Sequence, residues 1–186
     1  MYAKALITTL FLATAAFAAP APTNTTPDET TKTNAHNRVT HSVVAGLGGL
    51  KFDPDNVVAE IGDIVEWHFL PKNHSVAQSS FSEPCKPLDN GVSFFPGFQF
   101  ATQEGQATNV FQIEVKDKKP IWYYCPQQNG NHCQAGMVGV INQNFDDQNF
   151  SLRRHRELAA LTEKSVIPAI SSEGQVIVNP NPNGGF

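Results

Sequence analysis

The sequence predicts an all-β domain, a sandwich or a barrel, followed by a short helical appendage. Between residues 39 and 144, runs rich in Val, Ile, Phe, Trp and Tyr alternate with Gly, Pro and Asn at intervals that suit antiparallel strands. Only one later stretch has apolar residues at helical spacing. A chain of 186 residues has room for one ordinary domain plus tails, and not for a multidomain enzyme.

The first 38 residues are expected to lie outside the domain. Residues 1–18 combine Lys4, an apolar run at 5–12 and small residues at 16–18, which is the pattern of a secretory signal peptide. Residues 19–38 are rich in Pro, Thr, Asn and Asp and predict a flexible leader. The apolar run is too short for a membrane anchor. We therefore expect a secreted protein, extracellular or in a cell wall.

Five strands are expected, at residues 57–60, 64–69, 109–115, 121–124 and 137–141. The first two flank Gly62-Asp63, which predicts a strand, tight turn, strand unit. Alternation along the second strand places Trp67 on the inner face and His68 on the outer face. The phenylalanine-rich run at 94–100 is interpreted as core packing rather than as a docking patch.

Residues 145–186 are expected to form a C-terminal extension of the domain, which spans residues 39–144. Apolar and charged residues between 152 and 164 predict an amphipathic, mainly solvated helix. Beyond Ser171 the composition predicts a disordered tail. The net charge is −4 and there is no basic patch, so a nucleic-acid partner is not expected.

The segment between the aromatic strand and the last strand carries the chemistry. It begins at Cys125 and ends at His132-Cys133-Gln134-Ala135-Gly136-Met137. A loop that folds back here could aim one thiolate, one imidazole and one thioether at a single point, and His74, after the strand at 64–69, would complete the set. Two His, one Cys and a weak Met form a soft site that suits a copper cycling between two oxidation states. His36, His41, His68 and His155 are given no metal role.

The chain has three cysteines, an odd number for a protein in an oxidising compartment. One disulfide would leave one thiol for another purpose. Three Asn-x-Ser/Thr sequons, at Asn24, Asn73 and Asn149, are candidate glycosylation sites. A glycan on Asn73 would crowd the neighbouring His74.

Several motifs give the chain a family resemblance over roughly residues 43–142. They are Phe52-x-Pro54, Gly62-Asp63-x-Val65, Asn73-His74-Ser75-Val76, Trp122-Tyr123-Tyr124-Cys125 and His132-Cys133-x-x-Gly136-Met137. With these motifs the chain resembles the small fungal secreted cupredoxins, blue copper domains similar to plant phytocyanins and plastocyanin. The resemblance implies a Greek-key β-sandwich.

The resemblance also implies the roles of individual residues. It makes His74, Cys125 and His132 the equatorial ligands of one type-1-like copper, and Met137 the axial ligand. It pairs Cys85 with Cys133 in a disulfide, which leaves Cys125 as the metal thiolate. The chain departs from the family in a slightly longer loop, with Asn129-Gly130-Asn131 as the insert.

The expected function is therefore single-electron transfer or copper handling, with an unidentified redox partner protein and no catalysis. A filled coordination shell leaves no position for a substrate, and no second cluster of catalytic groups is visible. The alternative is a non-redox structural or adhesion module of the cell surface or wall. The intact ligand set speaks against that alternative, whereas the sequence leaves electron transfer and copper buffering equally open.

Overall fold

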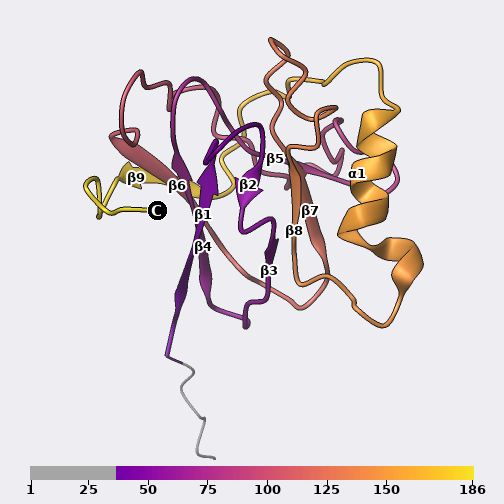
Figure 1. The fold of residues 1–186 in the computed structure, drawn as a ribbon. Coiled ribbons are helices and arrows are strands. Elements are labelled where there is room, and N and C mark those ends of the chain that lie inside the picture. Colours follow the sequence, from indigo (N-terminus) through magenta and orange to yellow (C-terminus); the bar gives the residue numbers. More distant parts are fainter. Residues whose placement is uncertain (1–36) are drawn as a thin grey trace, which may run out of the picture. The chain divides into compact units, whose positions relative to one another are not determined.

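The structure is a computed structural model that describes residues 37–186 (Figure 1). The expected signal peptide, almost all of the leader, the Asn24 sequon and His36 lie outside the described residues. Within residues 37–186, no helix is long and apolar enough to cross a membrane. The described strands form two sheets, which together make a β-sandwich.

The larger sheet has five strands in the order β2-β1-β4-β6-β9. These are β1 (Thr40–Ala45), β2 (Phe52–Asp53), β4 (Ile64–Phe69), β6 (Asn109–Glu114) and β9 (Gln175–Val178). Strands β1 and β4 are parallel, and the other pairs in this sheet are antiparallel. The parallel pair requires a crossover between β1 and β4, because a tight hairpin can join only antiparallel strands.

The smaller sheet has four strands in the order β3-β8-β7-β5. These are β3 (Asn56–Val57), β5 (Ala77–Ser79), β7 (Ile121–Tyr124) and β8 (Val138–Ile141). Strand β3 runs parallel to β8, whereas β5 and β8 both run antiparallel to β7. The strands expected at 109–115, 121–124 and 137–141 correspond to β6, β7 and β8.

The strand, tight turn, strand unit expected around Gly62-Asp63 is wrong. A turn is present, because the Asp63 amide donates to Glu60 O at 3.1 Å and Gly62 has φ +93°. However, β3 pairs with β8 in one sheet and β4 pairs with β1 and β6 in the other. The Asp63 side chain accepts hydrogen bonds from the Val39 amide at 3.0 Å and the Glu60 amide at 2.9 Å. These bonds fix the turn as a connection between sheets.

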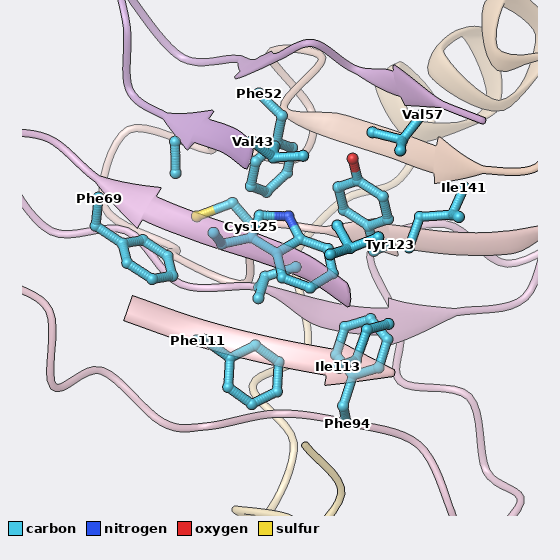
Figure 2. Close-up of a cluster of buried hydrophobic side chains, with 14 of the residues drawn as sticks. Val43, Phe52, Val57, Phe69, Phe94, Phe111, Ile113, Tyr123, Cys125 and Ile141 are labelled. Carbon is cyan, nitrogen blue, oxygen red and sulfur yellow. The ribbon is translucent and has the colours of Figure 1, made fainter. Parts of the chain in front are cut away.

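The core between the sheets is aromatic (Figure 2). Trp67 from β4 contacts Tyr123 from β7 edge-on, with ring centroids 5.3 Å apart, and Phe52 contacts the same tyrosine at 5.0 Å. Trp67 therefore faces inward as predicted. Phe94, Phe95 and Phe100 are also buried, which supports the interpretation of the 94–100 run as core.

The outer face of β4 is covered, which corrects two expectations. His68 is on the outer face but is buried, between Glu66 Oε1 at 2.7 Å and Gln106 Oε1 at 2.8 Å. The ring of Phe186 lies 5.1 Å from the His68 ring. The disordered tail predicted beyond Ser171 is wrong, because β9 pairs with β6 and the following residues cover His68.

The C-terminal extension contains the expected helix, α1 (Leu152–Ala160), which ends four residues before the predicted end. A 3₁₀ turn, Gln148–Phe150, precedes the helix. Ser151 begins α1 as its N-cap, its Oγ accepting from the Arg154 amide at 3.3 Å. His155 is fully buried, and its Nδ1 bonds Phe81 O at 3.0 Å. Its ring lies 4.8 Å from that of Trp122 in β7. Thus α1 packs on the smaller sheet through a buried face that includes a histidine.

Candidate metal centre

The four candidate ligands all come from one end of the sandwich. Cys125 directly follows the last residue of β7, and Met137 directly precedes β8. His132 lies in the loop between these strands. His74 lies five residues after β4 ends. The ends of neighbouring strands in both sheets therefore bring His74 and Cys125, which are 51 positions apart in the sequence, to one place.

Three of the four side chains meet. The donor atoms of His74, Cys125 and His132 all lie within 4.8 Å of one another, and no other such group of three His, Cys, Asp or Glu side chains occurs in the described residues. Cys125 Sγ lies 3.4 Å from His132 Nδ1. The two imidazole rings have centroids 4.9 Å apart. The exposed fractions are 3% for His74, 0% for Cys125 and 7% for His132, so the cluster is closed to bulk water.

Met137 closes the loop through its backbone. Its carbonyl accepts from the Cys125 amide at 3.0 Å, and its amide donates to His132 O at 3.0 Å. These bonds fold the loop back on itself, as the sequence predicted. The Met137 side chain is fully buried. A thioether in such a position gives a soft donor that never needs deprotonation.

The turn that begins the loop contains the expected insert. The Asn131 amide donates to Gln128 O at 3.1 Å, and the His132 amide donates to Gln127 O at 3.3 Å. Gly130 has φ +87° and Asn131 has φ +53°. Glycine and asparagine adopt such left-handed conformations most readily. The insert is therefore a compact turn that delivers His132 back toward Cys125.

Burial sets the protonation states of the three donors. It lowers the pKa of His74, and it lowers the pKa of His132 to about 4, with a smaller effect from the neighbouring His74. Burial raises the pKa of the Cys125 thiol to about 11, although backbone hydrogen bonds from Ser75 and Gln127 oppose the shift. At neutral pH both imidazoles are therefore uncharged and can donate a lone pair, whereas a metal must displace a proton from the thiol.

The residues fit a soft metal ion. His74 Nδ1 is buried and no hydrogen-bond partner faces it within the described residues, while His74 Nε2 lies 3.4 Å from Pro71 O. Buried polar atoms are normally satisfied, so an orphaned ring nitrogen in this cluster needs a partner. A metal bound to both Nδ1 atoms and to the thiolate would provide it. The His74, Cys125, His132 and Met137 cluster is consistent with one type-1 copper.

Gly46 is a residue of the site that the sequence analysis missed. It follows β1 with φ +97°, and a Cβ at this position would lie 2.6 Å from His74 Nε2. Only glycine leaves room for the His74 ring here. The run Gly46-Leu47-Gly48-Gly49 indicated a turn, but nothing in it marked which glycine touches a histidine in another strand connection.

A disulfide joins Cys85 and Cys133, the pairing that the family resemblance implied. It attaches the loop, one residue after His132, to the chain after β5. Cys125 is the free cysteine of the described chain and is buried. Of the sequons, Asn149 is exposed, whereas Asn73 is half-buried with Oδ1 buried and unpartnered.

The comparisons with known proteins identify two fungal relatives, although no family model matches the chain. An "Extracellular serine-rich protein" of Arthroderma benhamiae is 38% identical over 104 residues, which are 56% of this chain and 39% of that protein. A "Probable GPI-anchored cupredoxin-1" of the same fungus is 38% identical over 100 residues, 54% of this chain and 48% of that protein.

The chain is a two-sheet β-sandwich that is similar to a cupredoxin in sequence. One of the two sequence relatives is named as a cupredoxin, and the two-sheet sandwich with one short helix is consistent with that likeness. This cupredoxin-like chain matches less than half the length of either curated relative.

Solved structures that match part of the chain include a pseudoazurin from Sinorhizobium, with 18% identity and a TM-score of 0.37 over 55% of this chain and 72% of that one. A mutant plastocyanin of fern has 19% identity and a TM-score of 0.39 over 54% and 97% of the two chains.

Proposed function

We propose that this protein is a secreted mononuclear copper protein of the type-1 kind that carries single electrons. The observation that supports it most is the buried cluster of two imidazoles and one thiol whose donor atoms lie within 4.8 Å of one another. Such a donor set accommodates both copper oxidation states without large ligand movement, which favours fast electron transfer.

Each residue has a specific task in this proposal. His74 and His132 donate through Nδ1, because His74 Nδ1 is buried without another partner and His132 Nδ1 faces Cys125 Sγ at 3.4 Å. Cys125 would hold the metal as a thiolate, after losing its proton. Met137 would be the fourth protein ligand. When bound, copper supplies the redox chemistry by accepting and returning one electron.

The surrounding residues keep the donors in place and exclude water. Gly46 allows the His74 ring to approach, and the Cys85–Cys133 disulfide fixes the loop one residue after His132. His132 has the largest exposed fraction of the proposed ligands, 7%, so we expect electrons to enter and leave the site through it. Four protein donors leave no coordination position for a substrate, so we do not expect catalysis.

Secretion is part of the proposal. The disulfide requires an oxidising compartment, and the two fungal relatives are named as extracellular and as GPI-anchored. We expect release to the extracellular space or the cell wall, and an unidentified protein as its redox partner. Asn149, which is exposed, is the most accessible of the described glycosylation sequons.

Copper titration of the purified mature protein tests the function. We expect an intense blue thiolate-to-copper absorption band that saturates at one equivalent, with the matching electron paramagnetic resonance (EPR) spectrum. Cys125→Ser should abolish the band and leave the fold intact by circular dichroism. Absence of the band in the wild-type protein would instead leave a structural or adhesion module.

A second measurement separates electron transfer from copper buffering. A carrier should exchange electrons quickly and keep its copper when mixed with a competing chelator. A buffer should release the metal to the same chelator under mild conditions. Rapid loss of copper without rapid electron exchange would contradict the carrier role and favour copper handling.

A further inference from the structure

The loop that carries three of the proposed ligands is bound on one side by α1 and the segment that follows it. We define this segment as the C-terminal clasp, comprising Arg156, Thr162, Ser165 and Val166. The clasp lies outside residues 43–142, the part of the chain that resembles cupredoxins. Its contacts fall on both stretches of loop that separate one ligand from the next.

The first stretch runs from Cys125 to His132. Gln128, in its centre, donates from Nε2 to Ser165 O at 2.8 Å. Immediately before Cys125, Tyr124 donates from its hydroxyl to Val166 O at 2.7 Å. The clasp therefore holds the base of the Asn129-Gly130-Asn131 turn and the strand end that presents the thiol.

The second stretch runs from His132 to Met137, and Gln134 lies between them. The Gln134 amide is bound at both ends, donating to Thr162 Oγ1 at 3.1 Å and accepting from Ser165 Oγ at 3.2 Å. Ser165 is itself buried, with 2% exposure. A side-chain amide held at both ends has one orientation, which restricts the backbone on either side of it.

Arg156 contacts the residue before Met137. Its Nε donates to Gly136 O at 3.3 Å, and its Nη2 pairs with Asp55 Oδ2 at 2.7 Å. Gly136 has φ +99°, and a Cβ there would lie 3.3 Å from Arg156 Cδ. Arg156 thus lies closely over the Gly136 backbone while a carboxylate from the β2–β3 connection fixes its guanidinium.

The clasp is also anchored to residues outside the loop. The Val166 amide donates to Cys85 O at 2.8 Å, next to the disulfide. His155 and Ala159 of α1 are fully buried against the smaller sheet. A segment fixed at both ends can hold the loop rather than move with it.

We propose that the C-terminal clasp is a positioning element that holds the metal loop in its ligand-binding shape before the metal arrives. This inference rests on the proposed copper function and adds to it a second layer of residues outside the family-like region. Residues that orient metal ligands from outside commonly change metal affinity about 10- to 100-fold when removed. The hydrogen bonds of the clasp around the loop go to Tyr124, Gln128, Gln134 and Gly136, which lie beside or between the proposed ligands, so the clasp acts through the loop.

The test uses the full mature chain with two clasp variants and one control. Thr162→Val with Ser165→Ala removes both bonds to Gln134 and changes little volume. Arg156→Gln removes the contact with Gly136. Arg154→Gln is the matched control, because Arg154 is on the same helix and pairs with the exposed Glu157 instead of the loop.

The first readout is amide hydrogen exchange of Gly136 and Met137 in the metal-free protein. We expect about tenfold faster exchange in both clasp variants and no change in the control, as losing one or two hydrogen bonds predicts. The second readout is the EPR spectrum and the rate of copper loss to a chelator, which should change in the clasp variants alone. Urea unfolding shows whether each variant is folded. If the double variant does not fold, the single variant Thr162→Val replaces it.

Unchanged exchange, EPR spectrum and copper loss in folded clasp variants would overturn the inference. Equal changes in Arg154→Gln would also overturn it, because the effect would then belong to the helix as a whole. The exchange measurement requires no copper. If the wild-type protein binds none, the proposed function fails, and accelerated exchange in the clasp variants still shows that the clasp orders the loop.

Discussion

Replacing Gly46 by alanine should disturb the metal site through a single contact. The new Cβ would lie 2.6 Å from His74 Nε2 and 2.9 Å from His74 Cδ2, whereas ordinary contacts begin at 3.4 Å. The His74 ring or the turn must therefore move by about 0.8 Å to restore normal van der Waals separation. The ring is buried and cannot swing into solvent, so part of this displacement reaches Nδ1.

Two energies add in this variant, and a neighbouring glycine separates them. A side chain at positive φ costs about 1–2 kcal/mol of backbone strain wherever it is placed. Gly48 also has positive φ, +68°, but the atom nearest to its Cβ would be Lys51 Cε at 3.9 Å. Gly48→Ala therefore carries strain without the contact. The difference between the two variants reports the displacement of His74.

We expect Gly46→Ala to bind copper about 10- to 100-fold more weakly than Gly48→Ala, the range typical of a disturbed ligand orientation. Competition with a chelator measures the affinity, EPR reports the geometry, and urea unfolding of the metal-free protein reports the strain. Equal copper affinities and EPR spectra for the two variants would refute the role assigned to Gly46 and the placement of His74 in the site.

Three further predictions concern the core and protonation. Gly139→Ala should destabilise the metal-free protein by about 3 kcal/mol in urea unfolding, because the new Cβ would overlap the buried Tyr123 ring. In a Tyr123→Leu background, Gly139→Ala should cause almost no further loss of stability. Burial lowers the pKa of His155 to about 4. The unfolded chain therefore binds more protons than the folded chain between about pH 6.5 and 4. The free energy of unfolding should fall as the pH decreases through that window. His155→Gln, which keeps an N–H donor for Phe81 O, should reduce this fall by about 2–3 kcal/mol, and an unchanged pH dependence would contradict the assignment. Copper binding at pH 7 should release about one proton, since the Cys125 thiol has a pKa of about 11. Calorimetry in two buffers with different ionisation enthalpies measures the number of protons released. A result of no proton release would exclude the thiolate as a ligand.

The parts of the fold that could be predicted from sequence are those encoded by local pattern. Strict alternation identified β6, and the aromatic run identified β7. The cluster of donors was predictable because Cys125, His132 and Met137 lie in one short loop between two strands. Only His74 had to be joined to them from a distance.

The errors have a common physical cause, namely contacts between segments distant in sequence. Nothing near His68 indicated that it is buried, because the cover comes from Phe186 at the other end of the chain. The apolar run Val176-Ile177-Val178 after Gly174 carried a strand signal, but its polar surroundings outweighed it. The strand pairing around Gly62 failed because a local turn signal does not specify which sheet each flanking strand joins.

The arrangement of the three cysteines has a consequence for how the protein matures. A free thiol eight residues from a disulfide partner is open to oxidation and to exchange into the wrong pairing while the chain is unfolded. Once folded, Cys125 has no exposed surface and its raised pKa leaves almost no thiolate to react. The folded chain therefore keeps the Cys125 thiol reduced, and under the proposed function copper can be loaded after folding rather than during it.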